Sequence, residues 1–313
     1  MGISGLNNYF RNNCSKGINE ISIEALSGKK IVVDASIYMY KFKSEYNLID
    51  GFYQMLIMFK YYNIDLIFVF DGKPPAEKKE LIKDRRELRK TAKIEYNELI
   101  KKLLFCNKKE RQLIEMKIRK LKRQIVKIYK DEIIEVKQLL NIMGVSYYES
   151  EGESDIICAK LVIENMAYAC LSEDMDMFVY GCPRVLRYFS LHKKTTIFYN
   201  LCDILDSLNI SFNHFQIICI LAGTDYNKSH DKNNSFYKLN AIFKNYKNNY
   251  FRYDFINWLF INNHIDNKDE MYKTQDIFNT YNVEICDNKF YNSDENPEKL
   301  NILLKNNGFI MVE

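Results

Sequence analysis

Three short apolar runs that each lead into acidic residues restrict the possible folds of this chain more than any other feature. Residues 31–33 lead into Asp34, residues 66–70 into Asp71, and residues 167–171 into an acidic segment. Runs of this length, rich in β-branched and aromatic residues, are typical of buried strands, and their continuous apolarity favours a parallel sheet covered on both faces. Helical patterns alternate with the runs, which predicts an α/β domain with a central, mostly parallel twisted sheet flanked by helices. Helices are expected at 49–62 and 154–165, and further strands at 145–148, 185–189 and 196–199.

The acids near the ends of these strands form the candidate functional site. In an open parallel sheet, ligands bind in the crevice beyond the carboxyl ends of the strands. Seven carboxylates meeting there would repel one another strongly without counter-charge. Mg²⁺ and Mn²⁺ prefer such oxygen ligands, and two ions about 4 Å apart can polarise a phosphate and activate a water. The seven acids are Asp34, Asp71, Glu151, Glu153, Asp174, Asp176 and Asp225.

Each acid taken alone also has a purely structural explanation. Asp71 suits a turn, and Ser150 with Glu153 fits the capping box of a following helix. Glu151 would favour the dipole of that helix, and Asp155, one turn later, is expected to be a solvated helix residue and not a ligand. Because turn chemistry alone does not readily produce three acid-terminated strands and an acidic helix start, we favour the metal-binding interpretation.

Charge is segregated along the chain. The formal net charge is +4, yet residues 76–138 hold 21 Lys and Arg against 11 Asp and Glu, with no Gly or Pro. This segment therefore carries about +10 and the remainder about −6, which predicts a basic helical segment and an acidic body. Contacts from Lys and Arg to phosphates do not depend on sequence and are sensitive to salt. A coiled-coil-like helical hairpin is the structural alternative for the segment.

Other classes of protein fit less well. No apolar run approaches the roughly 18 residues that span a bilayer, so no membrane partner is expected, and the first 13 residues lack the apolar core of a signal peptide. The eight cysteines contain no C-x-x-C pair, and the four histidines have no metal-ligand spacing. We therefore expect a reduced, intracellular protein that is not secreted, in which any metal is held by oxygen.

Ordered motifs stand in the first 226 residues: MGI at 1–3, VDAS at 33–36, FVFDGKPP at 68–75, EGE at 151–153, SEDMD at 172–176 and GTDY at 223–226. Together these motifs resemble the flap endonuclease family, the XPG-type structure-specific 5′ nucleases. The resemblance implies a PIN-like nuclease core over 1–226, with 76–138 as a basic helical arch. It also implies a Mg²⁺-dependent enzyme that cuts DNA at single-strand/double-strand junctions, chiefly 5′ flaps, with 5′–3′ exonuclease activity, in replication, repair or recombination.

The resemblance also implies roles for individual residues. Two Mg²⁺ ions, which Mn²⁺ can replace, would share the acids. Lys78 and Arg85 at the base of the arch would engage the scissile phosphate, a nucleobase would stack on Tyr40, and Gly2 would contact the substrate. Without the resemblance, a solvated basic helix face would explain Lys78 and Arg85, and ordinary packing would explain Tyr40. The implied ligands are Asp34, Asp71, Glu151 and Glu153 for one ion, and Asp174, Asp176 and, through water, Asp225 for the other, with Glu153 shared.

The chain departs from the family pattern after Tyr226. The family has a helix-turn-helix element there, with a glycine turn that binds duplex backbone, often through K⁺, but residues 227–237 contain no glycine. We expect 227–313 to be an Asn- and Tyr-rich, mainly helical region with a divergent helix-turn-helix element, and the K⁺ site is in doubt. Residues 275–281 carry only part of a sliding-clamp peptide, so a clamp partner is not supported.

The divergence suits a member of the family from a large DNA virus, located in the nucleus or at a cytoplasmic viral replication site. Two alternatives to a flap endonuclease remain. One is a related PIN-type RNase or junction resolvase, and the other is a non-catalytic DNA-junction adaptor. The presence of all seven acids argues against the adaptor.

Overall fold

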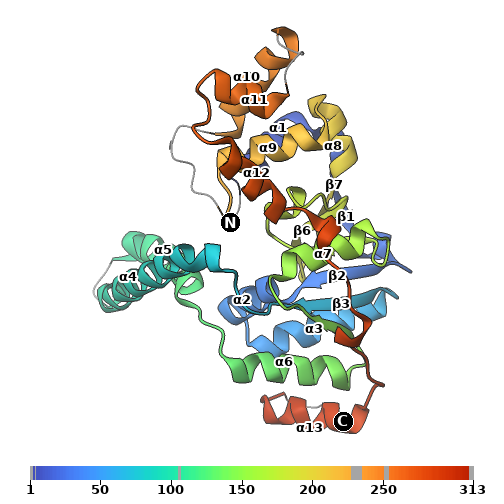
Figure 1. The fold of residues 1–313 in the computed structure, drawn as a ribbon. Helices are drawn as coiled ribbons and strands as arrows, with labels where there is room; N and C mark the ends of the chain where they lie inside the picture. Colours follow the sequence, from blue (N-terminus) through green and yellow to red (C-terminus); the bar gives the residue numbers. More distant parts are fainter. Residues whose placement is uncertain (1–2, 4, 105–106, 227–234, 250–253, 310–313) are drawn as a thin grey trace.

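The computed structural model describes residues 3, 5–104, 107–226, 235–249 and 254–309. Within these residues, eight strands form one sheet in the order β1-β7-β6-β5-β2-β3-β4-β8 (Figure 1). The five central strands run parallel, and antiparallel strands flank them at both edges. This topology confirms the predicted α/β fold. The strands are β1 (Ile18–Ser22), β2 (Lys30–Asp34), β3 (Asp65–Phe70), β4 (Ser146–Glu149), β5 (Ala169–Leu171), β6 (Arg184–Ser190), β7 (Thr195–Asn200) and β8 (Phe290–Tyr291).

Helices cover both faces of the sheet. Ile31 and Val33 of β2 pack into one apolar cluster and Val32 into the other, and all three side chains are fully buried. Successive side chains of a strand point to opposite faces, so only a sheet between two helical layers buries such a run. One layer contains α2 (Ala35–Glu45), α3 (Leu48–Tyr61), α6 (Lys130–Ile142) and α13 (Pro297–Asn306). The other contains α1 (Leu6–Asn13), α7 (Ser154–Ile163), α8 (Leu201–Leu208), α9 (Phe212–Ala222), α10 (Phe236–Asn249), α11 (Phe255–Ile261) and α12 (Lys268–Ile277).

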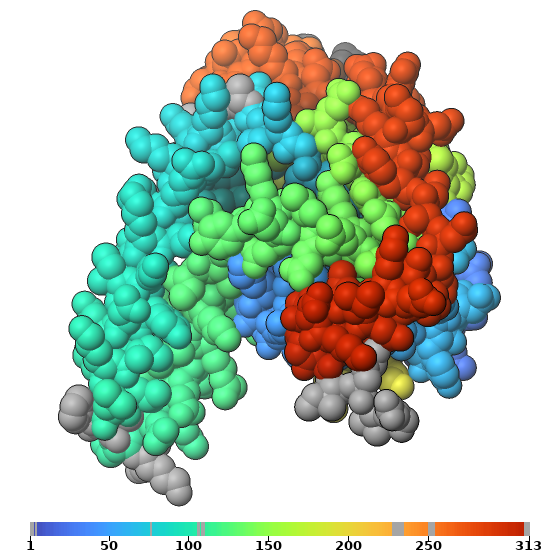
Figure 2. Space-filling model, turned by 90° about the horizontal axis from the view of Figure 1, so that it is seen from below, coloured from blue at the N-terminus to red at the C-terminus, as the bar shows by residue number. Residues whose placement is uncertain are grey.

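A helical hairpin projects from the body of the molecule. It consists of α4 (Lys79–Leu103) and α5 (Lys108–Ile125), which pack against each other (Figures 1 and 2). Ala92 and Leu121 are buried, while most of the described lysines and arginines of the hairpin are exposed. The projecting part of the basic segment thus ends at Ile125. The remainder forms α6, which returns to the sheet because Val136 and Leu140, one turn apart, are both fully buried.

The C-terminal region is mainly helical, as predicted, and part of it joins the core. β8 pairs with β4 in the sheet, and α13 packs against α6. Neither contact was predicted, because a two-residue strand carries no readable pattern. The segment 227–237, expected to hold the divergent helix-turn-helix element, lies outside the described residues up to 234.

Among the described residues, no single helix has the length and apolarity to cross a membrane. One pair, α8 with α9, meets the two criteria only when taken together, and it is bent by 87°.

Candidate functional site

Asp34 and Asp71 meet at one edge of the sheet because β2 and β3 are parallel and in register. Asp34 ends β2, is 3% exposed, and accepts a hydrogen bond from the backbone N–H of Ile37 at 3.3 Å, so it also caps α2. The hydroxyls of Ser154 and Ser172 donate to its two carboxylate oxygens at 3.4 and 3.2 Å. The strand end therefore places this carboxylate in a polar environment that is buried from solvent.

Asp71 links the sheet edge to the start of α7. Its Oδ1 accepts the backbone N–H of Ser154, the first residue of α7, at 2.7 Å, and its Oδ2 accepts the hydroxyl of Ser36 at 2.5 Å. The capping box considered for Ser150 and Glu153 is therefore wrong. Glu153 itself occupies the N-cap position without a side-chain cap bond, and Ser150 Oγ donates to its backbone carbonyl at 3.1 Å. Because Asp71 caps the helix, the carboxylate of Glu153 is free to face the cations.

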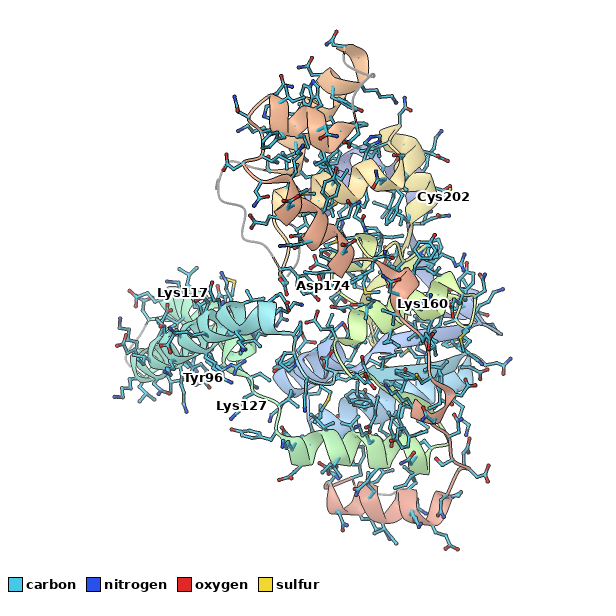
Figure 3. The ribbon with its side chains drawn as sticks, in the orientation of Figure 1. Tyr96, Lys117, Lys127, Lys160, Asp174 and Cys202 are labelled. Carbon is cyan, nitrogen blue, oxygen red and sulfur yellow. The ribbon has the colours of Figure 1, made fainter. Side chains whose placement is uncertain are left out.

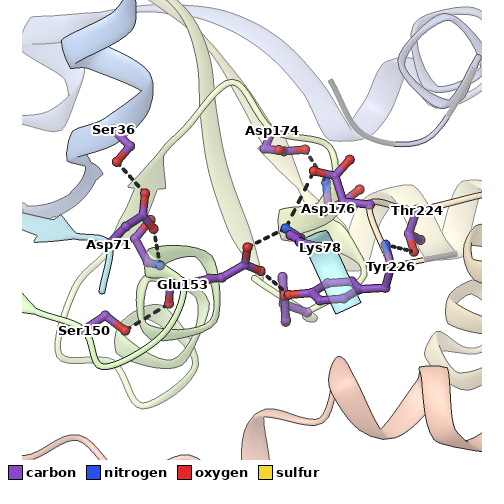
Figure 4. Close-up of polar contacts among 12 residues, drawn as sticks. Ser36, Asp71, Lys78, Ser150, Glu153, Asp174, Asp176, Thr224 and Tyr226 are labelled. Atoms are coloured by element: carbon purple, nitrogen blue, oxygen red, sulfur yellow. Dashed lines mark hydrogen bonds and ion pairs between the residues drawn. The ribbon is translucent and has the colours of Figure 1, made fainter. Parts of the chain in front are cut away.

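Two cations from the base of the hairpin are paired with acids of the site, and Figure 4 shows one of them, Lys78, beside Glu153. Lys78 Nζ lies 2.6 Å from Glu153 Oε1 and 3.6 Å from Asp225 Oδ2, and its side chain is only 9% exposed. Arg85 Nη2 lies 2.7 Å from the same Asp225 oxygen. Burial lowers the pKa of Lys78, but the hydrogen bond and charge of Glu153, helped by Asp225, outweigh burial and raise it overall. Lys78 is thus held fully charged between two carboxylates.

The acidic loop after β5 adds Asp174 and Asp176, and Figure 3 shows Asp174 beside the base of the hairpin. The backbone N–H of Asp176 donates to Asp174 Oδ1 at 3.0 Å, while Asp176 Oδ1 is buried and has no hydrogen-bond partner among the described residues. The guanidinium of Arg187, on β6, donates to the backbone carbonyl of Glu173 in this loop at 2.9 Å. A strand side chain therefore fixes the loop that carries both acids.

The buried acids have raised pKa values. Burial, followed by the charge of Asp71 and then of Asp174, raises the pKa of Asp34 to about 7. Burial and the charges of Asp174 and Asp225 raise the pKa of Asp176 well above its usual range. In both cases desolvation and like charge oppose ionisation, which is the environment that a bound cation would relieve.

This shift predicts that the metal-free protein loses stability as the pH rises. The pKa of Asp34 is higher in the folded chain, about 7, than its ordinary 3.8, so the folded state holds this proton more tightly. Its contribution to the free energy of unfolding is fully present below pH 4 and is lost as the pH rises through 7. Asp34→Asn does not titrate at this position. Between pH 5 and 8 its free energy of unfolding, measured with urea in EDTA, should therefore rise relative to that of the native protein by on the order of 2–4 kcal/mol. If the free energies of unfolding of the two proteins change with pH in parallel, the raised pKa of Asp34 is contradicted.

Asp155 is a site residue that sequence reasoning missed. It lies in the first turn of α7, partly buried, and burial followed by the charges of Asp34 and Asp174 raises its pKa well above its usual range. The expectation of a solvated helix residue is therefore wrong. Its position could have indicated the site, because Asp155 follows Glu153 by two residues in the first turn of the helix that begins at the carboxyl ends of the strands.

Two other predicted residues, Glu151 and Tyr40, do not meet this cluster among the described residues. Glu151 is 84% exposed in its side chain, and its carboxylate lies 2.5 Å from Lys289 Nζ. The loop after β3 holds its backbone: Lys73 N donates to the carbonyl of Glu151 at 2.9 Å, and Gly72 N to that of Gly152 at 2.7 Å. A Cβ at Gly72 would lie 2.2 Å from a backbone oxygen, so only glycine permits this approach. Tyr40 lies on α2 with 42% of its surface exposed, and Gly2 lies outside the described residues.

The donor set fits hard divalent cations. Among the described residues, no three acidic, cysteine or histidine side chains are already arranged as a cation site. The groups that face one another are nevertheless almost all carboxylates, and one of their oxygens, Asp176 Oδ1, is buried and finds no partner in the described part of the chain. Carboxylate oxygens without imidazole or thiolate are typical of Mg²⁺ and Mn²⁺ sites and not of zinc sites.

A parallel sheet with acids at its carboxyl edge, and with a basic helical hairpin whose cations reach those acids, defines the nuclease-core fold of the XPG type. Family models for the XPG N-terminal domain and the XPG I-region match residues 1–92 and 144–225. The chain is 32% identical to flap endonuclease 1 of Encephalitozoon cuniculi over 243 residues. The aligned region covers 72% of this chain and 68% of that protein. The chain belongs to the XPG-type flap endonuclease family.

Two further comparisons set the extent of the likeness. Flap endonuclease 1-A of Oryza sativa subsp. japonica is 31% identical over 245 residues, 72% of this chain but only 62% of that protein. The chain thus spans less than two thirds of the length of the rice protein. A structure of the catalytic core of Rad2 in complex with DNA substrate superposes with a TM-score of 0.69 at 20% identity, covering 97% of this chain and 94% of that one. The superposition shows that the fold is shared over nearly the whole chain.

Proposed function

We propose that this protein is a Mg²⁺-dependent, structure-specific nuclease that hydrolyses DNA at single-strand/double-strand junctions, preferably 5′ flaps, with an accompanying 5′–3′ exonuclease activity. The observation that carries the proposal is the pairing of Lys78 and Arg85, from the base of a basic hairpin, with Glu153 and Asp225 of an acidic cluster. Cations that can bind phosphate thus stand beside acids that can bind metal. The names of the relatives, flap endonuclease 1, support the same activity, and the related Rad2 core binds a DNA substrate.

In this proposal the acids serve two metal ions as two groups. When bound, Mg²⁺ would polarise the scissile phosphodiester and lower the pKa of the attacking water. Glu151 would join the first group once its carboxylate leaves Lys289, and Asp155 lies close enough to both groups to add charge to either. The first group is Asp34, Asp71 and Glu153, and the second is Asp174, Asp176 and Asp225.

The basic residues would bind and orient the DNA. Lys78 and Arg85 would exchange a carboxylate for a phosphate oxygen of the substrate, and their positive charge would stabilise the negative charge that develops there. Tyr40, exposed on the helix that follows Asp34, would stack against a base next to the cut. The α4/α5 hairpin would act as the arch that guides a single strand to the site. In this proposal residues 1–226 form the nuclease core, and 227–313 form a mainly helical C-terminal region that packs against it.

A single incubation series tests the function. Purified protein is mixed with end-labelled 5′-flap, nicked, duplex and four-way-junction DNA and with an RNA flap, each in Mg²⁺ and in EDTA. We expect cleavage of the 5′ flap in Mg²⁺ and none in EDTA. Preferential cleavage of the junction or of RNA would favour the resolvase or RNase alternative. Failure to cut any substrate in Mg²⁺ would refute the enzymatic proposal.

Arg85→Ala is expected to slow cleavage without weakening metal binding. The guanidinium contacts one acid at the rim of the cluster and is 42% exposed, so its removal leaves the other carboxylates in place. Loss of one charged contact to the phosphate should lower the single-turnover rate about a hundredfold. Arg86→Ala, one position along the same helix, is the matched control and should be close to native. A native single-turnover rate for Arg85→Ala would remove its assigned role.

A further inference from the structure

Two tyrosines from separate segments form a hydrogen-bonded chain that ends on Glu153. Tyr226 follows Asp225 directly, and its hydroxyl contacts Glu153 Oε2. Tyr180, which follows the acidic loop, places its own hydroxyl 3.0 Å from that of Tyr226. Figure 4 shows the ring of Tyr226 lying between Glu153 and Thr224, whose Oγ1 accepts the backbone N–H of Tyr226 at 3.3 Å.

The direction of these hydrogen bonds follows from counting protons. An ionised carboxylate has no proton, so Tyr226 must donate its single hydroxyl proton to Glu153. The hydroxyl of Tyr226 can then only accept from a neighbour, and Tyr180 must be the donor. The chain therefore runs from Tyr180 to Tyr226 to Glu153, and each bond polarises the next.

The same tyrosine ring also contacts Lys78. Lys78 Nζ lies 4.6 Å from the centre of the Tyr226 ring, while it is 2.6 Å from Glu153 Oε1. A cation at this distance from an aromatic ring is attracted to its face. Tyr226 thus fixes the position of both members of the Lys78–Glu153 pair, one through its hydroxyl and the other through its ring.

Both tyrosines pack against one aromatic residue of the C-terminal region. The ring of Phe278, which follows α12, lies 4.9 Å from the ring of Tyr180 and 5.3 Å from that of Tyr226. Phe278 is 1% exposed and Tyr180 is 3% exposed, so neither ring has room to turn. The buried rings therefore anchor Tyr180, and the partly buried Tyr226 packs against the same Phe278 ring.

We propose that Tyr226 is a positioning residue for the nuclease site, which orients Glu153 toward the metal and Lys78 toward the phosphate, and that Tyr180 acts through it. The proposal rests on the proposed nuclease function. Partners that orient a metal ligand typically change metal affinity or activity 10- to 100-fold when they are removed. A tyrosine that served only to fill space would change stability and leave both quantities unaltered.

The test compares Tyr226→Phe with Tyr180→Phe, because each substitution keeps the ring and removes one hydroxyl. Mn²⁺ binding is measured by calorimetry on DNA-free protein, and single-turnover cleavage of a 5′ flap is measured in Mg²⁺. For Tyr226→Phe we expect Mn²⁺ affinity to fall about tenfold and the rate 10- to 100-fold. Tyr180→Phe should lower both by several-fold. The double variant should be no worse than Tyr226→Phe alone, because Tyr180 acts only through Tyr226.

Tyr9→Phe is the matched control. The Tyr9 hydroxyl is also buried, and it accepts a hydrogen bond from Asn240 at 2.6 Å. Tyr9→Phe should lower thermal stability and leave Mn²⁺ affinity and rate at the native values. Native Mn²⁺ affinity in Tyr226→Phe, or additive losses in the double variant, would overturn the positioning role. Loss of Mn²⁺ affinity in Tyr226→Phe with no cleavage by the native protein would instead keep the positioning role and reject the nuclease.

Discussion

Asp174→Ala is expected to lower the rate of 5′-flap cleavage by about a thousandfold or more, while affinity for the DNA remains close to native. Asp174 is 8% exposed, accepts the backbone N–H of Asp176, and lies close enough to Asp34 to raise the pKa of that acid. It belongs to the acid cluster and makes no described contact with the basic hairpin. A metal contributes several kcal/mol to the stabilisation of the transition state, and each 1.36 kcal/mol changes the rate tenfold.

Two measurements separate this effect from unfolding and from loss of substrate binding. Single-turnover cleavage in Mg²⁺ gives the rate, and fluorescence anisotropy of a labelled flap in Ca²⁺ gives the affinity. Asp294→Ala removes an exposed acid of the C-terminal segment and should behave as the native protein. If Asp174→Ala cuts at the native rate, the second group of acids is not a metal site. If it loses DNA affinity to the same extent as rate, Asp174 acts through substrate binding.

Lys78→Ala is expected to have the second large effect, and its size should depend on metal. Lys78 is nearly buried between Glu153 and Asp225, so its removal leaves two carboxylates without their cation. Breaking a buried pair by deleting one partner typically costs about 3–5 kcal/mol. In EDTA the free energy of unfolding should fall by about 3 kcal/mol, and in Mg²⁺ by clearly less, because a bound divalent cation supplies the missing charge. The cleavage rate should fall about a hundredfold or more.

Arg85→Ala provides the comparison for stability. Arg85 pairs with the same Asp225 but is 42% exposed, so solvent and salt weaken the pair. Its removal should cost less than about 1 kcal/mol in EDTA. Urea unfolding of both variants in EDTA and in Mg²⁺ makes the distinction. An equal loss for Lys78→Ala under the two conditions would show that Mg²⁺ does not bind next to Glu153.

Much of the site follows from local pattern. Asp34 and Asp71 were predicted to meet because an apolar run ends at each of them, and parallel strands bring their carboxyl ends to one edge. Lys78 and Arg85 were placed at the hairpin base by resemblance, and the structure brings both to Asp225. The meeting of Asp34 and Asp71 could be read from short stretches of chain whose burial pattern is nearly continuous. The roles of all four residues in metal binding and catalysis stay predictions.

Two side chains lie elsewhere than expected, and both placements depend on contacts between distant segments. Glu151 was expected in the cluster, but Lys289, 138 residues later, holds its carboxylate outside. Asp155 was expected in solvent, but the cap that Asp71 provides to α7 turns the start of that helix toward the acids. No local pattern identifies the partner of a side chain when that partner comes from another part of the chain.

By itself the sequence determined that parallel strands exist, that they end in acids and that a basic helical segment interrupts them. These properties arise from the pattern of burial and charge over stretches of about 5 to 60 residues, and they do not depend on how the helices and strands pack against one another. Only the tertiary structure decided which carboxylate faces which cation and which tyrosine orients Glu153. Those pairings depend on distances of about 3 Å between segments far apart in the chain, and hydrogen bonds weaken steeply beyond that range.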